Sequence, residues 1–226
     1  MKISAVMAAF NAERYVAAAI ESILAQTRKA DEIIVVDDGS TDRTAEVLAR
    51  YADKITLLRQ ENRGPATAFN RGIAAASGNM LAFQDADDLW AENKLDLQSC
   101  TLAEDPDLDA VFGYIKQFVS EDVPPEIARN YLVPDPQPGI SKIGMLIRRA
   151  AFDRTGGFDS NLAVLEFVDW YARAQALGIK VRVENQIVAF RRLHESNSGR
   201  LKRAEQQQET LLGLKQALDL RRKKRS

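Results

Sequence analysis

The chain has 226 residues, of which 46% are hydrophobic and 28% are charged, and its formal net charge is −1. This composition is typical of an ordinary globular protein with one sizeable domain, and it gives no reason to expect nucleic acid as a partner. Cys100 is the only cysteine and His194 the only histidine, which excludes an intrachain disulfide and a cysteine- or histidine-rich metal cluster. The start of the chain lacks the features of a signal peptide, and no apolar run approaches the ~20 residues that span a bilayer, so we expect a cytoplasmic protein.

Strands that alternate with helices are predicted for the first half of the chain. Four apolar runs predict strands: residues 3–8, 32–36, 55–58 and the run that ends at Asp85. Apolar residues at helical spacing predict helices over 14–25 and 65–76, and Thr41 or Asp42 has a side chain suited to cap the start of a third. This order predicts an α/β fold in which helices flank a mostly parallel, twisted sheet.

The second half of the chain is less regular. Its predicted elements are helices over 90–103 and 165–177, strands over 110–119 and within 181–193, ordered structure over 143–152 and a turn over 156–159. Residues 123–139 contain five of the seven prolines, so we expect neither a helix nor a central strand there. A segment of this length without secondary structure is either a lid over a cleft or a surface connection.

An acidic stretch follows the predicted buried strand of residues 81–83. It reads Asp85-Ala86-Asp87-Asp88, so Asp85 and Asp87 stand one residue apart at the carboxyl end of a strand, where open α/β sheets bind ligands. Two such carboxylates can turn toward one hard divalent cation, and Mg²⁺ usually shares its ligands with substrate phosphates. The alternative is a solvated acidic turn, because Asp is common in turns.

Four motifs in chain order resemble those of family 2 glycosyltransferases with the GT-A fold. They are Phe10-Asn11, Asp37-Asp38-Gly39-Ser40-Thr41-Asp42, Asn62-Arg63-Gly64-Pro65 and Asp85-Ala86-Asp87-Asp88. Each lies at the end of a predicted strand or the start of a predicted helix, and the resemblance covers roughly residues 3–195. It implies one GT-A domain over 1–198, with a Rossmann-like half over 1–90 that binds a nucleotide sugar and an acceptor-side half over 91–198.

The resemblance implies where a nucleotide-sugar donor binds. Ala8 and Phe10 stand where the family lines the base pocket, although the family usually has Pro and Tyr at these places, and Asn11 belongs to the same donor site. Asp38 matches the carboxylate that accepts the ring N–H of the base, which uracil or thymine can supply. Arg63 falls near the basic residue that meets the base or the phosphates, and its alternative is a solvated surface arginine.

The same resemblance implies a metal site. Asp85 matches the carboxylate that reaches the ribose and metal side, with Ala86 beside it, and Asp87 matches the direct ligand of Mn²⁺ or Mg²⁺. In several relatives, a histidine at a place comparable to that of His194 closes over the diphosphate or completes the metal shell; the alternative is an ordinary surface histidine. A metal bound there would offset the charge on the departing diphosphate.

The clearest departure from the family lies at the catalytic base. Family members commonly have Glu-Asp at the start of the helix after the Gly-Gly-Phe-Asp turn, and this Asp deprotonates the acceptor hydroxyl. Here the pair reads Glu166-Phe167, and phenylalanine cannot accept a proton. Glu166 and Asp169 share a helix face, so either can serve as general base, with Asp169 slightly favoured. The alternative is that both are helix-start carboxylates favoured by the helix dipole.

These features predict a metal-dependent, inverting glycosyltransferase that moves a sugar from a UDP- or dTDP-type donor to an acceptor hydroxyl. The acceptor is an unknown saccharide, lipid-linked or other hydroxyl compound. Phe167 leaves open a catalytically weak or inactive relative that only binds nucleotide sugars, and a nucleotidyltransferase is a further alternative.

The C-terminal tail lies outside the resemblance. The spacing of apolar residues over 199–226 predicts a partly amphipathic helix that ends in the basic run 221–225. The favoured interpretation is that cations at a helix C-terminus interact with its dipole. The alternative is a dock for an acidic partner or an anionic membrane surface, which would place a cytoplasmic protein at the inner face of the membrane. A homodimer is also compatible with the sequence.

Overall fold

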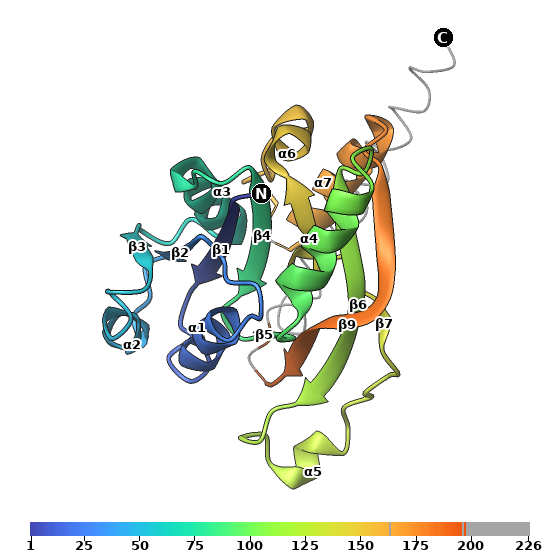
Figure 1. Ribbon diagram of the computed structural model, residues 1–226. Coiled ribbons are helices and arrows are strands. Elements are labelled where there is room, and N and C mark those ends of the chain that lie inside the picture. The colour runs from blue at the N-terminus through green and yellow to red at the C-terminus, as the bar shows by residue number, and fades with distance from the viewer. Residues whose placement is uncertain (163, 196, 198–226) are drawn as a thin grey trace.

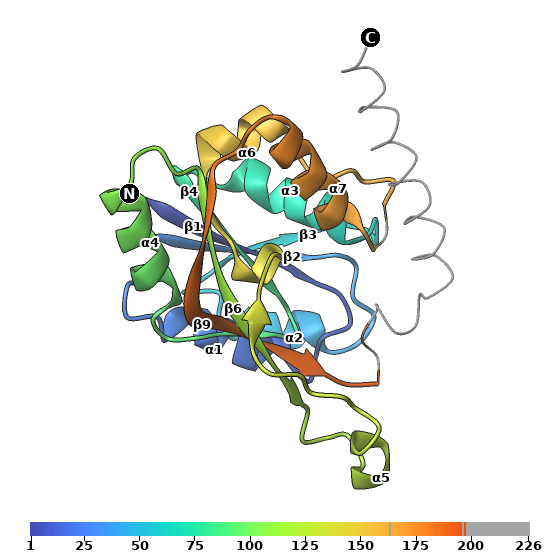
Figure 2. The same cartoon turned by 90° about the vertical axis from the view of Figure 1, so that its right-hand side faces the viewer.

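The structure is a computed structural model that describes residues 1–162, 164–195 and 197. These residues form a nine-stranded sheet with helices on both faces (Figures 1 and 2), which confirms the predicted α/β fold. The predicted basic tail, residues 199–226, lies outside the described residues. In the part of the chain that is described, no helix is long and apolar enough to span a membrane.

Strand β1 lies at the centre of the nucleotide-binding half. It covers Ile3–Ala9 and pairs in parallel with β2 (Glu32–Asp37) on one side and β4 (Met80–Asp85) on the other. Strand β3 (Thr56–Arg59) continues the sheet in parallel with β2. All four predicted strands of this half are therefore confirmed, and they run in the same direction, as the alternation with helices predicts.

The helices of this half are α1 (Val16–Leu24), α2 (Thr44–Ala49) and α3 (Pro65–Ala75). Helix α2 begins later than predicted, because Asp42 Oδ1 accepts a hydrogen bond from the Thr44 amide at 2.9 Å and so forms a turn before the helix. Helix α3 approaches β1 closely at Gly72, where an added Cβ atom would lie 2.5 Å from Cγ1 of Val6. This close packing fixes the start of α3 relative to the strand ends.

The second half adds strands of both directions. They are β5 (Leu89–Trp90), β6 (Ala110–Val119), β7 (Gln137–Pro138), β8 (Leu146–Arg148) and β9 (Val181–Leu193). The strand order is β3-β2-β1-β4-β8-β6-β9-β5, with β7 beside β6. Strand β8 runs antiparallel to β4 and β6, whereas β9 runs parallel to β6 as one long strand. Strand β5, which follows the turn after β4, pairs with β9, so the carboxyl end of β9 lies near that of β4.

Two predictions for this half are wrong. The helix expected over 90–103 is α4 (Lys94–Glu104), because Leu89 and Trp90 pair with β9 instead. The proline-rich residues 123–139 include a one-turn helix, α5 (Pro125–Ala128), although no helix was expected there. Pro125 occupies the first helical position, where no backbone N–H is needed. Figure 1 shows α5 projecting below the rest of the molecule.

The two faces of the sheet bury separate apolar cores. One face packs against α1, α2 and α4, and the other against α3, α6 (Arg149–Thr155) and α7 (Glu166–Ala176), as Figure 2 shows from the side. The side chains of β1 alternate between the two cores, with Met7 on the first face and Val6 on the second. By the same alternation, the side chain of Asp85 falls on the face of α3 and α7.

A buried polar network ties α4 to the sheet. Lys94 is 0% exposed, and its Nζ donates to Gln98 Oε1 at 2.8 Å and to the Met145 carbonyl at 3.3 Å. The Gln98 amide donates to the carbonyls of Val111 at 2.9 Å and Gly144 at 2.7 Å. Burial disfavours the charged ammonium and holds the pKa of Lys94 well below its ordinary value.

Lys94→Met should therefore change how stability depends on pH. Between the lowered pKa of Lys94 in the folded state and its ordinary value of 10.5, the unfolded chain binds more protons than the folded one. The parent should gain unfolding free energy relative to the variant as the pH rises through this interval, by about 1.4 kcal/mol per pH unit. Urea unfolding of both proteins between pH 7 and 10 measures this; Lys54→Met, at an exposed position, is the control. A constant difference between parent and variant across this pH range would contradict a buried neutral lysine.

Candidate active site

Three of the four sequence motifs meet because the carboxyl ends of parallel strands lie at one edge of the sheet. In the register of β1, Ala9 lies opposite Asp37 of β2, and Ala8 lies opposite Asp85 of β4. The Asp38 amide donates to the Ala9 carbonyl at 2.8 Å, which extends this pairing by one residue. The loops after β1, β2 and β4 therefore begin side by side.

Asn11 joins the loop after β1 to the loop after β2. Its φ of 47° is the only positive value of a non-glycine residue in the part of the chain that is described, a conformation that Asn tolerates. Asn11 Oδ1 accepts a hydrogen bond from the Thr41 amide at 2.9 Å, and the Asn11 amide donates to Ser40 Oγ at 3.0 Å. Phe10, which is exposed (46%), therefore directly precedes a residue that two hydrogen bonds hold to the next loop.

Asp38 is buried and shapes the loop before α3. Its Oδ1 accepts hydrogen bonds from Gln60 Nε2 at 2.7 Å and from the Arg63 amide at 2.9 Å, and its Oδ2 accepts one from the Gly64 amide at 2.9 Å. Gly64 has a φ of 86°, which a side chain would disfavour. A carboxylate can accept about four hydrogen bonds, so these three leave Oδ2 able to accept another from a ligand.

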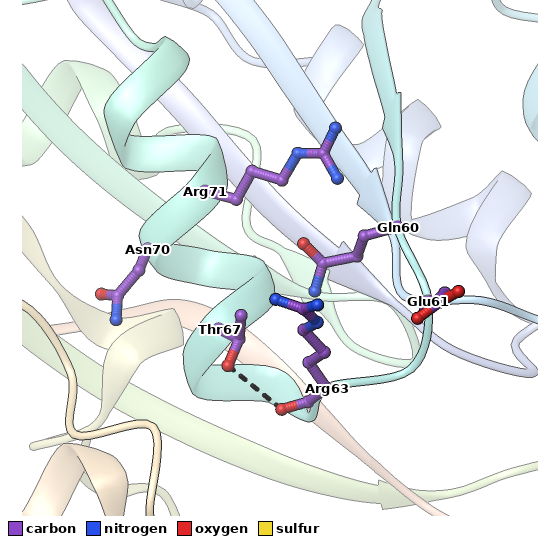
Figure 3. Close-up of a pocket in the computed structure, with 6 residues that line it drawn as sticks. All are labelled: Gln60, Glu61, Arg63, Thr67, Asn70 and Arg71. Carbon is purple, nitrogen blue, oxygen red and sulfur yellow. Dashed lines mark hydrogen bonds between the residues drawn. The ribbon is translucent and has the colours of Figure 1, made fainter.

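An open pocket of about 710 Å³ lies beside this loop. It is lined by Gln60, Glu61, Arg63, Thr67, Asn70 and Arg71 (Figure 3). The guanidinium of Arg63 points back toward Gln60, and Arg71 enters from α3 with its Nη1 bonded to the Arg59 carbonyl at 2.8 Å. Two cations therefore face one hollow next to the Asp38 carboxylate. Arg63 thus lies next to Asp38, in the loop to which the resemblance assigns a contact with the base or the phosphates.

The acidic stretch after β4 forms a turn whose members differ in role. The Asp88 amide closes the turn by donating to the Asp85 carbonyl at 3.2 Å, and Asp88 Oδ1 accepts a hydrogen bond from the Arg192 amide at 2.8 Å. Burial, together with the neighbouring carboxylates, raises the pKa of Asp88 well above its ordinary value. Asp88 therefore serves to hold the end of β9 against the turn, a role that the sequence did not indicate.

Asp85 lies at the centre of the charged groups. Its pKa is raised, first by burial and further by the charges of Asp87 and Glu166, while Lys142 and Arg191 act in the opposite direction. The Asp85 carboxylate is thus within electrostatic range of its neighbour Asp87 and of Glu166, which is distant in sequence. The turn after β4 and the start of α7 therefore lie close together.

His194 meets Asp87 although the two residues are far apart in sequence. His194 Nε2 lies 3.0 Å from Asp87 Oδ2, and Asn197 Nδ2 lies 3.4 Å from the same oxygen. The His194 ring is also 4.6 Å from the ring of Tyr15, and a pocket of about 340 Å³ opens beside them. Arg192 Nε donates to the Asp87 carbonyl at 2.9 Å. The histidine that the sequence pairs with the acidic motif is therefore beside it in space.

Glu166 and Asp169 have different surroundings. Glu166 is 3% exposed; its Oε1 is paired with Lys142 Nζ, and its Oε2 is buried without a hydrogen-bond partner among the described residues. Asp169 Oδ2 is bonded to Arg173 Nε at 2.9 Å. Arg173 also donates to the carbonyls of Thr155 and Gly157, so the Asp169 pair secures the turn after α6.

Phe167 is part of the core. Its ring stacks on Trp170 at 5.9 Å and on Tyr171 at 6.0 Å, and it meets Phe112 edge-on at 6.4 Å. These aromatic contacts explain an apolar residue at the place where the family commonly has its base. Lys142 is the site residue that the sequence analysis missed. Its signal in the sequence is its place directly before the apolar run 143–147. A lysine that is buried next to such a run needs a partner for its charge.

Comparison with known proteins bears on this arrangement. The family model described as glycosyl transferase family 2 matches residues 4–158. An uncharacterized glycosyltransferase of Nostoc sp., alr2836, is 48% identical over 99 residues, which are 42% of this chain and 31% of that protein. WfaP of Escherichia coli, described as a UDP-Glc:α-D-GlcNAc-diphosphoundecaprenol β-1,3-glucosyltransferase, is 27% identical over 204 residues, or 85% of this chain and 77% of that enzyme.

A solved structure has the same fold. The mannosyltransferase PcManGT of Pyrobaculum calidifontis, in complex with GDP-Man and Mn²⁺, superposes with a TM-score of 0.70 at 20% identity, over 96% of this chain and 64% of that one. The match to the Nostoc relative spans about a third of that protein's length. Because the family model matches more than half of the residues of this chain and the sheet has the GT-A arrangement, the protein is a member of glycosyl transferase family 2 with the GT-A fold.

Proposed function

We propose that the chain moves a sugar from a nucleotide-diphosphate donor to an acceptor hydroxyl, with inversion at the anomeric carbon. The observation that carries this proposal is the position of Asp85 at the carboxyl end of β4, where it is close enough to Asp87 and Glu166 for their charges to raise its pKa. A donor phosphate held near Asp87 and an acceptor hydroxyl held at Glu166 then meet at the end of one strand. Such proximity is a large part of what an enzyme needs to promote a displacement.

The proposed donor site is the edge formed by the loops after β1 and β2. Ala8, Phe10 and Asn11 line it from one side, Asp38 accepts the ring N–H of the base, and Arg63 meets the base or the phosphates. The rigid loop at Asn11, the remaining acceptor capacity of Asp38 Oδ2 and the exposed ring of Phe10 support this assignment. A uracil or thymine base fits an N–H acceptor, and WfaP is described as an enzyme that uses UDP-Glc.

Mn²⁺ or Mg²⁺ is the proposed cofactor, and the donor atoms suit it. Asp87 Oδ2 and His194 Nε2 are 3.0 Å apart, and Asp85 and Ala86 belong to the same turn. Within residues 1–162, 164–195 and 197, no group of three or more His, Cys, Asp and Glu side chains is close enough to hold a metal alone. Diphosphate oxygens would supply the remaining ligands, and PcManGT is described with Mn²⁺. A bound cation would offset the charge on the leaving diphosphate.

Glu166 is the proposed general base. As the acceptor oxygen bonds to the anomeric carbon and the bond from that carbon to the diphosphate breaks, Glu166 Oε2 takes the proton of the acceptor hydroxyl. This oxygen has no hydrogen-bond partner in the described structure, so it is not already engaged as an acceptor and can take a proton that comes within hydrogen-bond reach. Asp169, which the sequence slightly favoured, is the second candidate; its partner Arg173 also bonds the carbonyls of Thr155 and Gly157, which supports a structural role for this pair.

The proposed acceptor is a lipid-linked saccharide, since WfaP is described as acting on α-D-GlcNAc-diphosphoundecaprenol. We assign residues 1–90 to the donor and 91–198 to the acceptor. Association with a membrane or an acidic partner through residues 199–226 stays a prediction, because these lie outside the described residues. The alternative of a binding-only relative rests on Phe167, and the free oxygen of Glu166 favours transfer instead.

Asp87→Asn should remove the metal dependence of donor binding. The amide lacks the charge that favours a divalent cation, so the affinity for uridine diphosphate in the presence of Mn²⁺ should fall at least ~10-fold, toward the value without metal. Calorimetry with and without Mn²⁺ measures this. Asp53→Asn, an exposed carboxylate before β3, should behave as the parent. If Asp87→Asn retains the full metal effect, the metal assignment is wrong.

Glu166→Gln should lower the turnover number ~100-fold or more and leave the donor KM within about twofold, because a general base acts in the transition state. Asp169→Asn is the matched control. It should keep most of the turnover number but lower the melting temperature, since Arg173 loses its partner. Steady-state kinetics over a panel of acceptors measures both. The opposite result would transfer the role to Asp169, and parental rates in both variants would exclude either residue as the base.

The parent should bind uridine diphosphate more tightly than cytidine diphosphate, because Asp38 offers an acceptor to the ring N–H that uracil has and cytosine lacks. Asp38→Asn should weaken uridine diphosphate binding ~10-fold or more, since an amide also places an N–H₂ group against the donors that hold the loop. Calorimetry with both nucleotides gives the ratio. Equal affinities of the parent for the two nucleotides would exclude Asp38 from selection of the base.

A further inference from the structure

Lys142 has no role in the function proposed above, yet it contacts the proposed base. It lies on the short helix η1 (Lys142–Gly144), and its side chain is only 11% exposed. Its ammonium is paired with Glu166 Oε1 and lies 4.9 Å from the centroid of the Phe69 ring. A buried ammonium needs such partners, because burial strongly disfavours an isolated charge.

The ammonium stays charged at this position. Burial acts to lower the pKa of Lys142, but the carboxylates of Asp85, Glu166 and Asp87 outweigh burial and raise the pKa above its ordinary value. Lys142 therefore acts on the carboxylate of the donor side, Asp85, and on that of the acceptor side, Glu166. Its charge reduces the repulsion between them.

The backbone that carries Lys142 is held from behind by α4. Gln98 Nε2 donates to the Gly144 carbonyl at 2.7 Å, and Lys94 Nζ donates to the Met145 carbonyl at 3.3 Å. Gln98 and Lys94 are both fully buried. The two bonds fix the main chain at the end of η1, so the Lys142 side chain starts from a rigid support.

Glu166 itself needs an external support. A glutamate has one more rotatable bond than the aspartate that the family commonly uses as base, so its carboxylate has more conformations to lose. Lys142 takes one carboxylate oxygen, and the second oxygen, Oε2, is left buried without a partner among the described residues. The pair thereby separates a held oxygen from an oxygen that can receive a proton.

We propose that Lys142 is a positioning residue for the base: it binds Oε1 of Glu166 and directs Oε2 toward the acceptor hydroxyl, which lets a glutamate serve where Phe167 has replaced the usual aspartate. This inference rests on the proposed function. Loss of Lys142 should lower the turnover number but leave donor binding unchanged, because Lys142 acts through Glu166 and not on the nucleotide.

The test compares Lys142→Met, Lys142→Arg, Glu166→Gln and the double variant Lys142→Met/Glu166→Gln. Transfer kinetics with a nucleotide-sugar donor, calorimetry with uridine diphosphate and Mn²⁺, and melting temperatures are measured for each. Lys142→Met should lower the turnover number ~10- to 100-fold and keep the donor KM and the nucleotide affinity within about twofold. Lys142→Arg should have a turnover number between those of the parent and of Lys142→Met. The double variant should be no slower than Glu166→Gln alone.

The control is Lys180→Met, which removes an exposed lysine paired with Asp107 and should behave as the parent. If Lys142→Met does not fold because Glu166 is left buried and unpaired, Lys142→Arg and the double variant carry the comparison.

Three results would overturn the inference while the proposed function stands: a parental turnover number in Lys142→Met, independent additive losses in the double variant, or a nucleotide affinity more than ~10-fold weaker in Lys142→Met. The last would make Lys142 a donor ligand. A parent that transfers no sugar from any nucleotide donor would overturn the proposed function and this inference together.

Discussion

Four carboxylates crowd the carboxyl end of β4, and the whole site depends on the groups that keep them there. They are Asp85, Asp87, Asp88 and Glu166. Left without partners in a partly buried place, like charges would repel each other or take up protons. In this protein a backbone amide binds Asp88, His194 lies against Asp87, and Lys142 is paired with Glu166. The site is therefore a group of carboxylates that are each held by a different neighbour, and Asp85 lies within electrostatic range of the other three.

The pairing of β1 brings the other half of the site to these carboxylates. Because β1 is parallel to both β2 and β4, the loops after these strands begin at the same level of the sheet. Asn11 accepts a hydrogen bond from the next loop, and Asp38 accepts one from the loop before α3, so three loops are connected into one rim. A rim held by its own hydrogen bonds can receive a nucleotide with little further ordering.

Two elements of the second half of the chain reach these carboxylates. The long strand β9 runs beside β6 and delivers His194 to Asp87. Helix α7 places Phe167 in the aromatic core, and since neighbouring helical residues point about 100° apart, Glu166 is turned away from that core toward Lys142. The packing of Phe167 thus also helps to fix the direction of Glu166 beside it.

The amino-acid sequence by itself determined the alternation of strands and helices, the parallel first half and the acidic motif at the end of β4, because hydrophobic periodicity and turn residues are local signals. Local signals do not report which distant segments share space. Only the tertiary structure decided that Lys142 accompanies Glu166 and that Asp88 binds the amide of Arg192. These outcomes depend on long-range pairing and on the burial of charges, which are set when the sheet and helices pack and not by any one stretch of the chain.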